Sequence, residues 1–180
     1  MHISFRGSPV TISIGASVTA GACFIAAVLW AGAADLVTMK IRNGLVLFLI
    51  AGYIILAPLS GIAWLDIGWS IAVAAGVLAC MFVLFGLGWI GGGDAKLAAV
   101  IALWLGADHA LAYILYTALF GGILTIVLLQ FRLMVLPLQC LTVPWIMRLH
   151  APETGVPYGV AITAAALFIF PATHWMKALT

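Results

Sequence analysis

The chain has 180 residues, of which 66% are hydrophobic and only 7% are charged, and its net charge at pH 7 is +2. A soluble domain carries about 25% charged residues, so this chain has far too few charges to cover a surface that faces water. The composition excludes a soluble globular enzyme, a disordered protein and a nucleic-acid-binding protein. It is typical of an integral membrane protein.

The apolar residues form long unbroken runs, which predict helices rather than the alternating strands of a membrane barrel. A helix needs about 20 apolar residues to cross a hydrocarbon core of about 30 Å. We therefore expect an all-α polytopic membrane protein with six transmembrane helices, at Ile14–Ala34, Gly44–Leu65, Ile67–Ile90, Ala95–Ala107, Ala110–Gln130 and Val156–Trp175. The segment Leu133–Met147 contains two prolines and is expected to lie at the interface before the last helix. Residues 1–180 are expected to form one membrane-embedded domain with its core at about 14–176.

Basic residues predict the orientation of these spans, because cytoplasmic loops carry an excess of Lys and Arg. Arg6 and Lys177 fall on the side that is then expected to be external, together with both termini, Asp66 and Asp108. Most of the seven tryptophans fall near the ends of the predicted spans, as in an interfacial aromatic belt. The expected cytoplasmic side carries the other five basic residues, Lys40, Arg42, Lys96, Arg132 and Arg148.

Two aspartates fall on the expected cytoplasmic side. Asp35 closes the first apolar run, and Asp94 follows three glycines, Gly91, Gly92 and Gly93. A carboxylate near hydrocarbon is costly and indicates a functional site, although Asp94 could also be the cap of a helix in a glycine-rich turn. The fourth segment is short, about 21 Å of helix if Asp108 marks its outer end, so we expect Asp94 to lie below the cytoplasmic surface in a pocket that water enters.

Two carboxyl groups held close together favour acid–base chemistry. They do not both ionise easily, so the pair can retain one proton near neutral pH. The ionised member can activate a water molecule while the protonated member polarises a carbonyl group, as in aspartic proteases. The sequence offers no metal-ligand spacing, and no cofactor is expected.

Three short motifs carry a resemblance to a known family. They are Asp35 followed by Lys40-Ile41-Arg42-Asn43, then Gly91-Gly92-Gly93-Asp94-Ala95-Lys96-Leu97, and Val156-Pro157-Tyr158-Gly159-Val160-Ala161. In this order they resemble the motifs of the bacterial type IV prepilin peptidases, membrane proteases with a GxGD motif. The resemblance implies a six-helix aspartic endopeptidase with Asp35 and Asp94 as its catalytic pair. It does not decide which aspartate is the base and which is the acid.

The same resemblance implies a substrate and a location. Family members cut the leader of a prepilin at the cytoplasmic face of the bacterial inner membrane, just before the hydrophobic N-terminal helix of the mature subunit. The short chain and the string Val156–Ala161 are most similar to the compact branch that serves Flp-type pili. This branch lacks the cysteine-rich insert of larger members, so N-methylation of the product is not expected. The family commonly has Ile-Pro-Asn where this chain has Ile41-Arg42-Asn43.

Other motif residues are expected to support the site. Gly91–Gly93 could dock the substrate leader in an extended conformation. Lys40 and Lys96 either attract acidic groups or serve as interfacial anchors that set the topology. The motifs also include Asn43, Pro157 and Gly159. The expected partners are a prepilin and the lipid bilayer, without nucleic acid, and the sequence does not determine the oligomeric state.

Three alternatives remain from the sequence. Another GxGD protease that cuts within a membrane span typically has more helices and a tyrosine beside the first aspartate, where this chain has Ala34. A small ion-coupled transporter could use Asp35 and Asp94 as a relay, but it would show repeats or broken helices in both halves, and only one glycine-rich break is present. A structural assembly factor would tolerate the loss of either aspartate.

Overall fold

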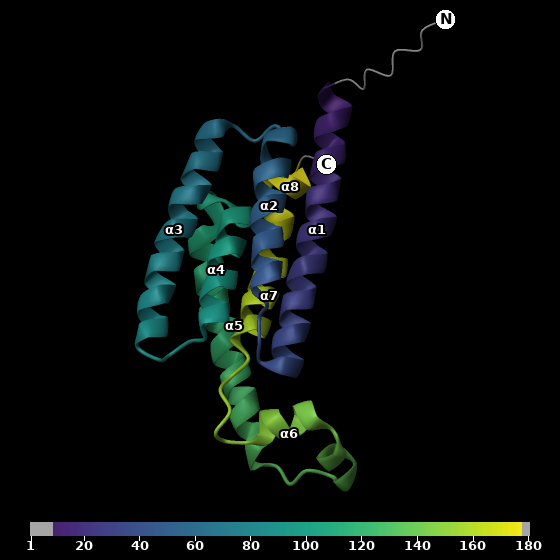
Figure 1. Cartoon of the computed structure of the whole chain (residues 1–180), viewed down its shortest axis with the longest axis vertical. Coiled ribbons are helices and arrows are strands. Elements are labelled where there is room, and N and C mark those ends of the chain that lie inside the picture. The colour runs from purple at the N-terminus through teal and green to yellow at the C-terminus, as the bar shows by residue number, and fades with distance from the viewer. Residues whose placement is uncertain (1–8, 178–180) are drawn as a thin grey trace, which may run out of the picture.

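The computed structural model describes residues 9–177, and this part of the chain is helical without any strand (Figure 1). The predicted all-α class is therefore confirmed, while Arg6 lies outside the described residues. The helices, with η for 3₁₀-helices, are α1 (Pro9–Thr38), α2 (Asn43–Leu59), α3 (Trp64–Gly86), α4 (Gly92–Leu105), α5 (Ala107–Leu133), η1 (Leu138–Thr142), α6 (Pro144–His150), α7 (Tyr158–Ile169), η2 (Phe170–Ala172) and α8 (His174–Lys177).

Four helical segments are long and apolar enough to cross a membrane, namely Ser13–Thr38, Trp64–Gly86, Ala107–Leu133 and Tyr158–Lys177. The other two predicted spans correspond to shorter helices, α2 with 17 residues and α4 with 14. The fold is thus that of a helical membrane protein, but six spans of full length are not observed. The segment Leu133–Met147 contains the end of α5 and short helices only.

Several predicted boundaries are wrong by a few residues because glycines end the helices early. Helix α2 ends at Leu59, six residues before its predicted end, and Gly61 follows it with a φ of 81°. Helix α3 ends at Gly86 rather than Ile90, and Gly88 has a φ of 75°. Glycine adopts this left-handed conformation without the steric cost of a Cβ atom, so it commonly terminates a helix.

Helix α4 lies at the centre of the bundle, where it packs against α2, α3, α5 and α7. Every residue from Leu97 to Leu105 is buried. A helix that is apolar on all sides is either enclosed in protein or spans a membrane, and the packing around α4 shows that it is enclosed. Because its neighbours surround it, α4 does not have to match the thickness of the bilayer, which explains how 14 residues suffice.

Two tryptophans belong to this core rather than to an aromatic belt. The indole N–H of Trp104 donates to the carbonyl oxygen of Leu49 at 2.9 Å, and the indole N–H of Trp175 donates to the carbonyl oxygen of Trp104 at 2.7 Å. Both side chains are fully buried, so the predicted interfacial position is wrong for them. Trp64, by contrast, is 76% exposed. A buried indole is tolerated where its N–H finds a partner.

The bundle has two distinct ends (Figure 1). At one, α1 begins and α8 closes the described chain; we call this the terminal end. At the other lie the connection from α1 to α2, residues 39–42, and the connection from α3 to α4, residues 87–91. We call this the aspartate end, because Asp35 and Asp94 lie there. The C-terminal part of α5 and helix α6 extend beyond the aspartate end.

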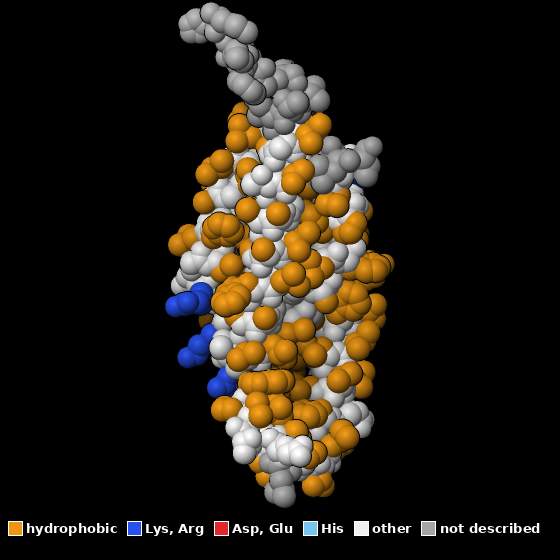
Figure 2. Space-filling model, turned by 90° about the vertical axis from the view of Figure 1, so that its right-hand side faces the viewer, with side chains coloured by type: hydrophobic (Ala, Val, Ile, Leu, Met, Phe, Trp, Pro, Cys, Tyr) orange, Lys and Arg blue, Asp and Glu red, His pale blue; other side chains and the backbone are white. Residues whose placement is uncertain are grey.

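Apolar side chains cover much of the surface. Figure 2 shows them from one end of the molecule to the other, with the visible Lys and Arg side chains along one edge. Only 17% of the most apolar stretch of α3, and the same share of α5, is buried inside the protein. Such a surface is unfavourable in water, and it fits contact with lipid.

Candidate active site

Asp35 lies in the last turn of α1 and is only 5% exposed. One of its carboxylate oxygens accepts a hydrogen bond from the backbone N–H of Gly159 at 2.8 Å. Gly159 is the second residue of α7, where N–H groups have no partner within the helix and the helix dipole favours a negative charge. The start of α7 therefore holds the carboxylate of Asp35 in place.

The contact between these two segments requires glycine at position 159. A Cβ atom there would lie 2.7 Å from a carboxylate oxygen of Asp35 and 2.8 Å from its Cβ atom. Real Cβ atoms do not approach other heavy atoms so closely. Any side chain at this position would push Asp35 away from the start of α7.

Asp94 lies in the first turn of α4 and is half-buried. The cap of this helix is Gly91 rather than Asp94, so the expectation of a capping aspartate is wrong. Asp94 and Asp35 line the same pocket. The Oδ1 atom of Asp94 is buried and has no hydrogen-bond partner in the described part of the chain.

A pocket of about 480 Å³ joins the two aspartates. Its walls come from the end of α1, the connection to α2 and the start of α4. The structure thus brings together seven of the motif residues expected at the site. The lining residues are Asp35, Met39, Lys40, Ile41, Arg42, Asn43, Gly91, Gly92, Gly93 and Asp94.

The three glycines before Asp94 allow close packing within the chain itself. A Cβ atom at Gly93 would lie 3.2 Å from the Cβ of Ile41, and one at Gly92 would lie 3.2 Å from the ring of Phe85. None of the three has a positive φ. The glycines therefore let the connection between α1 and α2 pass directly beside Asp94. Of the three glycines, only Gly91 is exposed.

Asn43 at the start of α2 and Arg42 at the end of the connection before it show how this segment is held. The amide oxygen of Asn43 accepts a hydrogen bond from the ammonium group of Lys96 at 3.2 Å. Lys96 does not line the aspartate pocket. Arg42, which stands where the resembling family has proline, has a φ of −74°, within the range that proline imposes. The backbone here therefore takes the conformation that a proline would favour.

Pro157 is buried directly before α7 and does not line the pocket. Its place in the site is indirect, since it precedes the helix start that carries Gly159. The connection that leads to it, residues 151–157, is held from α5.

Arg132 at the end of α5 holds this connection, and the sequence assigned it only to orientation. Its guanidinium donates to the carbonyl oxygens of Leu149 at 2.9 Å, Thr154 at 2.6 Å and Gly155 at 3.0 Å. Arg148 similarly donates to a carbonyl oxygen in the last turn of α1 at 2.6 Å. Contacts to backbone carbonyls leave no sequence signal, since any residue supplies the acceptor.

The terminal end holds a second pocket, of about 470 Å³, which contains Asp66, Asp108, His109 and His174 among its lining residues. Asp66 and Asp108 are exposed. Within residues 9–177 no group of three or more His, Cys, Asp or Glu side chains is placed to hold a metal ion. Both aspartates lie at the opposite end of the bundle from Asp35 and Asp94.

The aspartate pocket combines the parts of an acid–base pair. The carboxylate of Asp35 is buried and held by a backbone N–H, and Asp94 lines the same pocket and has a buried oxygen without a hydrogen-bond partner in the described part of the chain. Two adjacent carboxyl groups can share a proton, so one can accept a proton from water while the other donates one to a carbonyl oxygen.

A comparison with protein-family models finds a match to the type IV leader peptidase family over residues 22–126. The matched range includes both Asp35 and Asp94. No curated protein and no solved structure matches the chain.

Proposed function

Since the chain belongs to the type IV leader peptidase family, we propose that it is a membrane aspartic endopeptidase with Asp35 and Asp94 as its catalytic pair. Its substrate is the leader-bearing precursor of a type IV pilin. The observation that carries this proposal is the pocket that Asp35 and Asp94 both line.

The proposed mechanism uses both carboxyl groups and no metal. One aspartate takes a proton from a water molecule, which attacks the scissile carbonyl carbon, and the other protonates the carbonyl oxygen. The tetrahedral gem-diol then collapses, the C–N bond breaks, and the leaving amine takes up a proton. Either assignment of the two roles uses the same pocket.

The proposed membrane arrangement places six helices in the bilayer, with α4 enclosed by α2, α3, α5 and α7. The aspartate end faces the cytoplasm of a bacterial cell and both termini lie outside, in the inner membrane. The positive-inside rule supports this orientation, because Lys40 and Arg42 line the aspartate pocket and Arg132 and Arg148 hold the segments beside it.

We further propose that the precursor is of the Flp type and that its new N-terminus stays unmethylated. The support is the resemblance of the compact chain and of the string Val156–Ala161 to that branch. The connection between α1 and α2 spans only residues 39–42, which leaves no insert between these helices.

The test is cleavage of a Flp-type prepilin in liposomes by the wild type, Asp35→Asn and Asp94→Asn. Each substitution keeps the shape of the side chain but removes its acid–base function, so we expect a loss of at least about 100-fold. Asp66→Asn and Asp108→Asn at the terminal end are matched controls and should cleave at the wild-type rate.

The other outcomes identify the alternatives. Wild-type cleavage by either dyad variant would exclude the paired mechanism. A wild type that cuts no prepilin would favour the transporter, and a cut inside the apolar helix would favour the other GxGD proteases. Mass spectrometry of the product reports whether its new N-terminus is methylated.

A further inference from the structure

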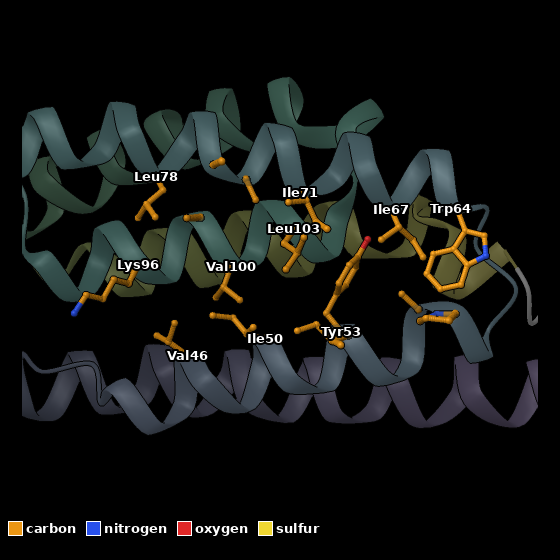
Figure 3. A pocket seen from close by; sticks show the side chains of 16 residues that line it. Val46, Ile50, Tyr53, Trp64, Ile67, Ile71, Leu78, Lys96, Val100 and Leu103 are labelled. Carbon is orange, nitrogen blue, oxygen red and sulfur yellow. The ribbon is translucent and has the colours of Figure 1, made fainter.

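A long apolar groove runs between α2 and α3 with α4 as its floor (Figure 3). Helices α2 and α3 both pack against α4 but hardly touch each other, which leaves an opening of about 670 Å³. Lys96 lies at one end of the groove and Trp64 at the other. Lys96 is the only charged side chain among the described residues that line it.

The dimensions of the groove suit a helix that is half embedded. On α2 the lining residues run from Val46 to Pro58, about 18 Å of helix at 1.5 Å per residue. A helix lying along the opening would have one side against α2, α3 and α4 and its other side facing lipid.

Several small side chains line the walls of the groove. Each of the three surrounding helices places alanine in the groove, at Ala57 of α2, Ala74 and Ala75 of α3, and Ala99 of α4. Small side chains let two helix backbones approach closely, and membrane helix interfaces are enriched in them because dispersion contacts drive association there.

The groove ends near the aspartate pocket, and one hydrogen bond links the two linings. Lys96 follows Asp94 by two residues in α4, and its ammonium group donates to Asn43, which lines the pocket. The end of the groove that holds Lys96 therefore lies at the aspartate end of the bundle. A helix in the groove would have one of its ends on the same side of the bundle as the two carboxyl groups.

We propose that this groove holds the apolar helix of the precursor, with the scissile bond before that helix reaching the aspartate pocket. The proposal rests on the proposed function and adds the surface that selects the substrate. An uncharged helix fits the walls, and its first turn lies beside Lys96.

The first test compares two substitutions on α3. Ala75→Trp fills the groove from an exposed position, whereas Ala72→Trp adds the same side chain at an exposed position outside it. We expect Ala75→Trp to lower kcat/KM for a full-length Flp-type prepilin at least tenfold, and Ala72→Trp to stay within twofold of the wild type. A peptide that carries the cleavage site without the apolar helix should be cut equally, if slowly, by all three proteins.

The two proposals fail in different ways. If the wild type cuts no prepilin, the proposed function is wrong. If the wild type cuts and Ala75→Trp cuts equally well, the enzyme stands and the groove proposal is overturned.

A second test measures contact with the substrate rather than activity. A photoreactive residue replaces Ile71, which is exposed in the groove, or Ala72 as the control, in the inactive Asp94→Asn protein. After illumination in liposomes with the prepilin, we expect a covalent adduct with its apolar helix from position 71 at least fivefold above that from position 72. Adducts only with phospholipid or with a second copy of the chain, or equal yields from both positions, would overturn the proposal.

Discussion

The two ends of the bundle carry pockets of similar volume, about 480 and 470 Å³, and each contains two aspartates. At the terminal end, Asp66 and Asp108 are exposed to the surroundings. At the aspartate end, Asp35 is buried and its carboxylate accepts a hydrogen bond from the N–H of Gly159. One oxygen of Asp94 is buried without a hydrogen-bond partner in the described part of the chain. A pocket with two carboxylates is therefore present at both ends. The pocket at the aspartate end differs because its carboxylates are more buried and the start of α7 contacts one of them.

Glycine is required for different reasons at the two ends of the bundle. Gly159 has a helical conformation but no room for a side chain, because Asp35 occupies that space. Gly106 at the terminal end has room, with its nearest neighbour at 3.7 Å, but its φ of 84° and ψ of 166° are accessible almost only to glycine. The first glycine should therefore matter for activity and the second for stability.

The largest effect is expected from Gly159→Ala. The new methyl group cannot coexist with Asp35 in its present position, so the carboxylate must leave the N–H of α7. We expect cleavage to fall at least about 100-fold, since a displacement of 1 Å in a catalytic group has effects of that size. The control is Gly122→Ala on α5, where an added Cβ would come within 4 Å of no other side chain or helix in the described part of the chain. A Gly159→Ala protein with wild-type activity would show that Asp35 need not be held by α7.

A smaller effect is expected from Arg132→Met, which removes the contacts to one carbonyl group in α6 and two in the connection from α6 to α7. The start of α7 then loses support from α5, and we expect cleavage to fall about tenfold through a misplaced Asp35. Arg132→Lys should fall nearly as far, because an ammonium group cannot reproduce the fork of a guanidinium. Gln130→Met on the same helix is the control. Full activity in Arg132→Lys would show that only the charge matters.

The smallest effect on activity is expected from Gly106→Ala. The substitution forces alanine into a strained backbone conformation that costs about 1–3 kcal/mol. The midpoint of thermal unfolding in detergent should fall, while the cleavage rate per folded molecule stays at the wild-type value. Loss of that rate would contradict the separation of the two ends into a catalytic and a structural one.

The two aspartates of the site could be predicted from the sequence, but the contacts around them could not. Asp35 and Asp94 stand out because charges are so scarce, and the glycines beside Asp94 mark a close approach. The partner in that approach was not predictable: Ile41 meets Gly93, and the N–H of Gly159 meets Asp35. These contacts join segments far apart in the chain, and no local pattern reports them.

The sequence by itself determined that this is a helical membrane protein, because apolar runs with few charges leave no other class, and it identified the family through three motifs. Only the tertiary structure decided which apolar helices face lipid and which are enclosed. Hydropathy cannot separate these cases, since lipid and a protein interior are both apolar, so buried α4 and Trp104 were indistinguishable from membrane-facing segments. Tertiary packing likewise decided that the start of α7 lies against Asp35. It also decided that α2 and α3 both pack on α4 while hardly touching each other.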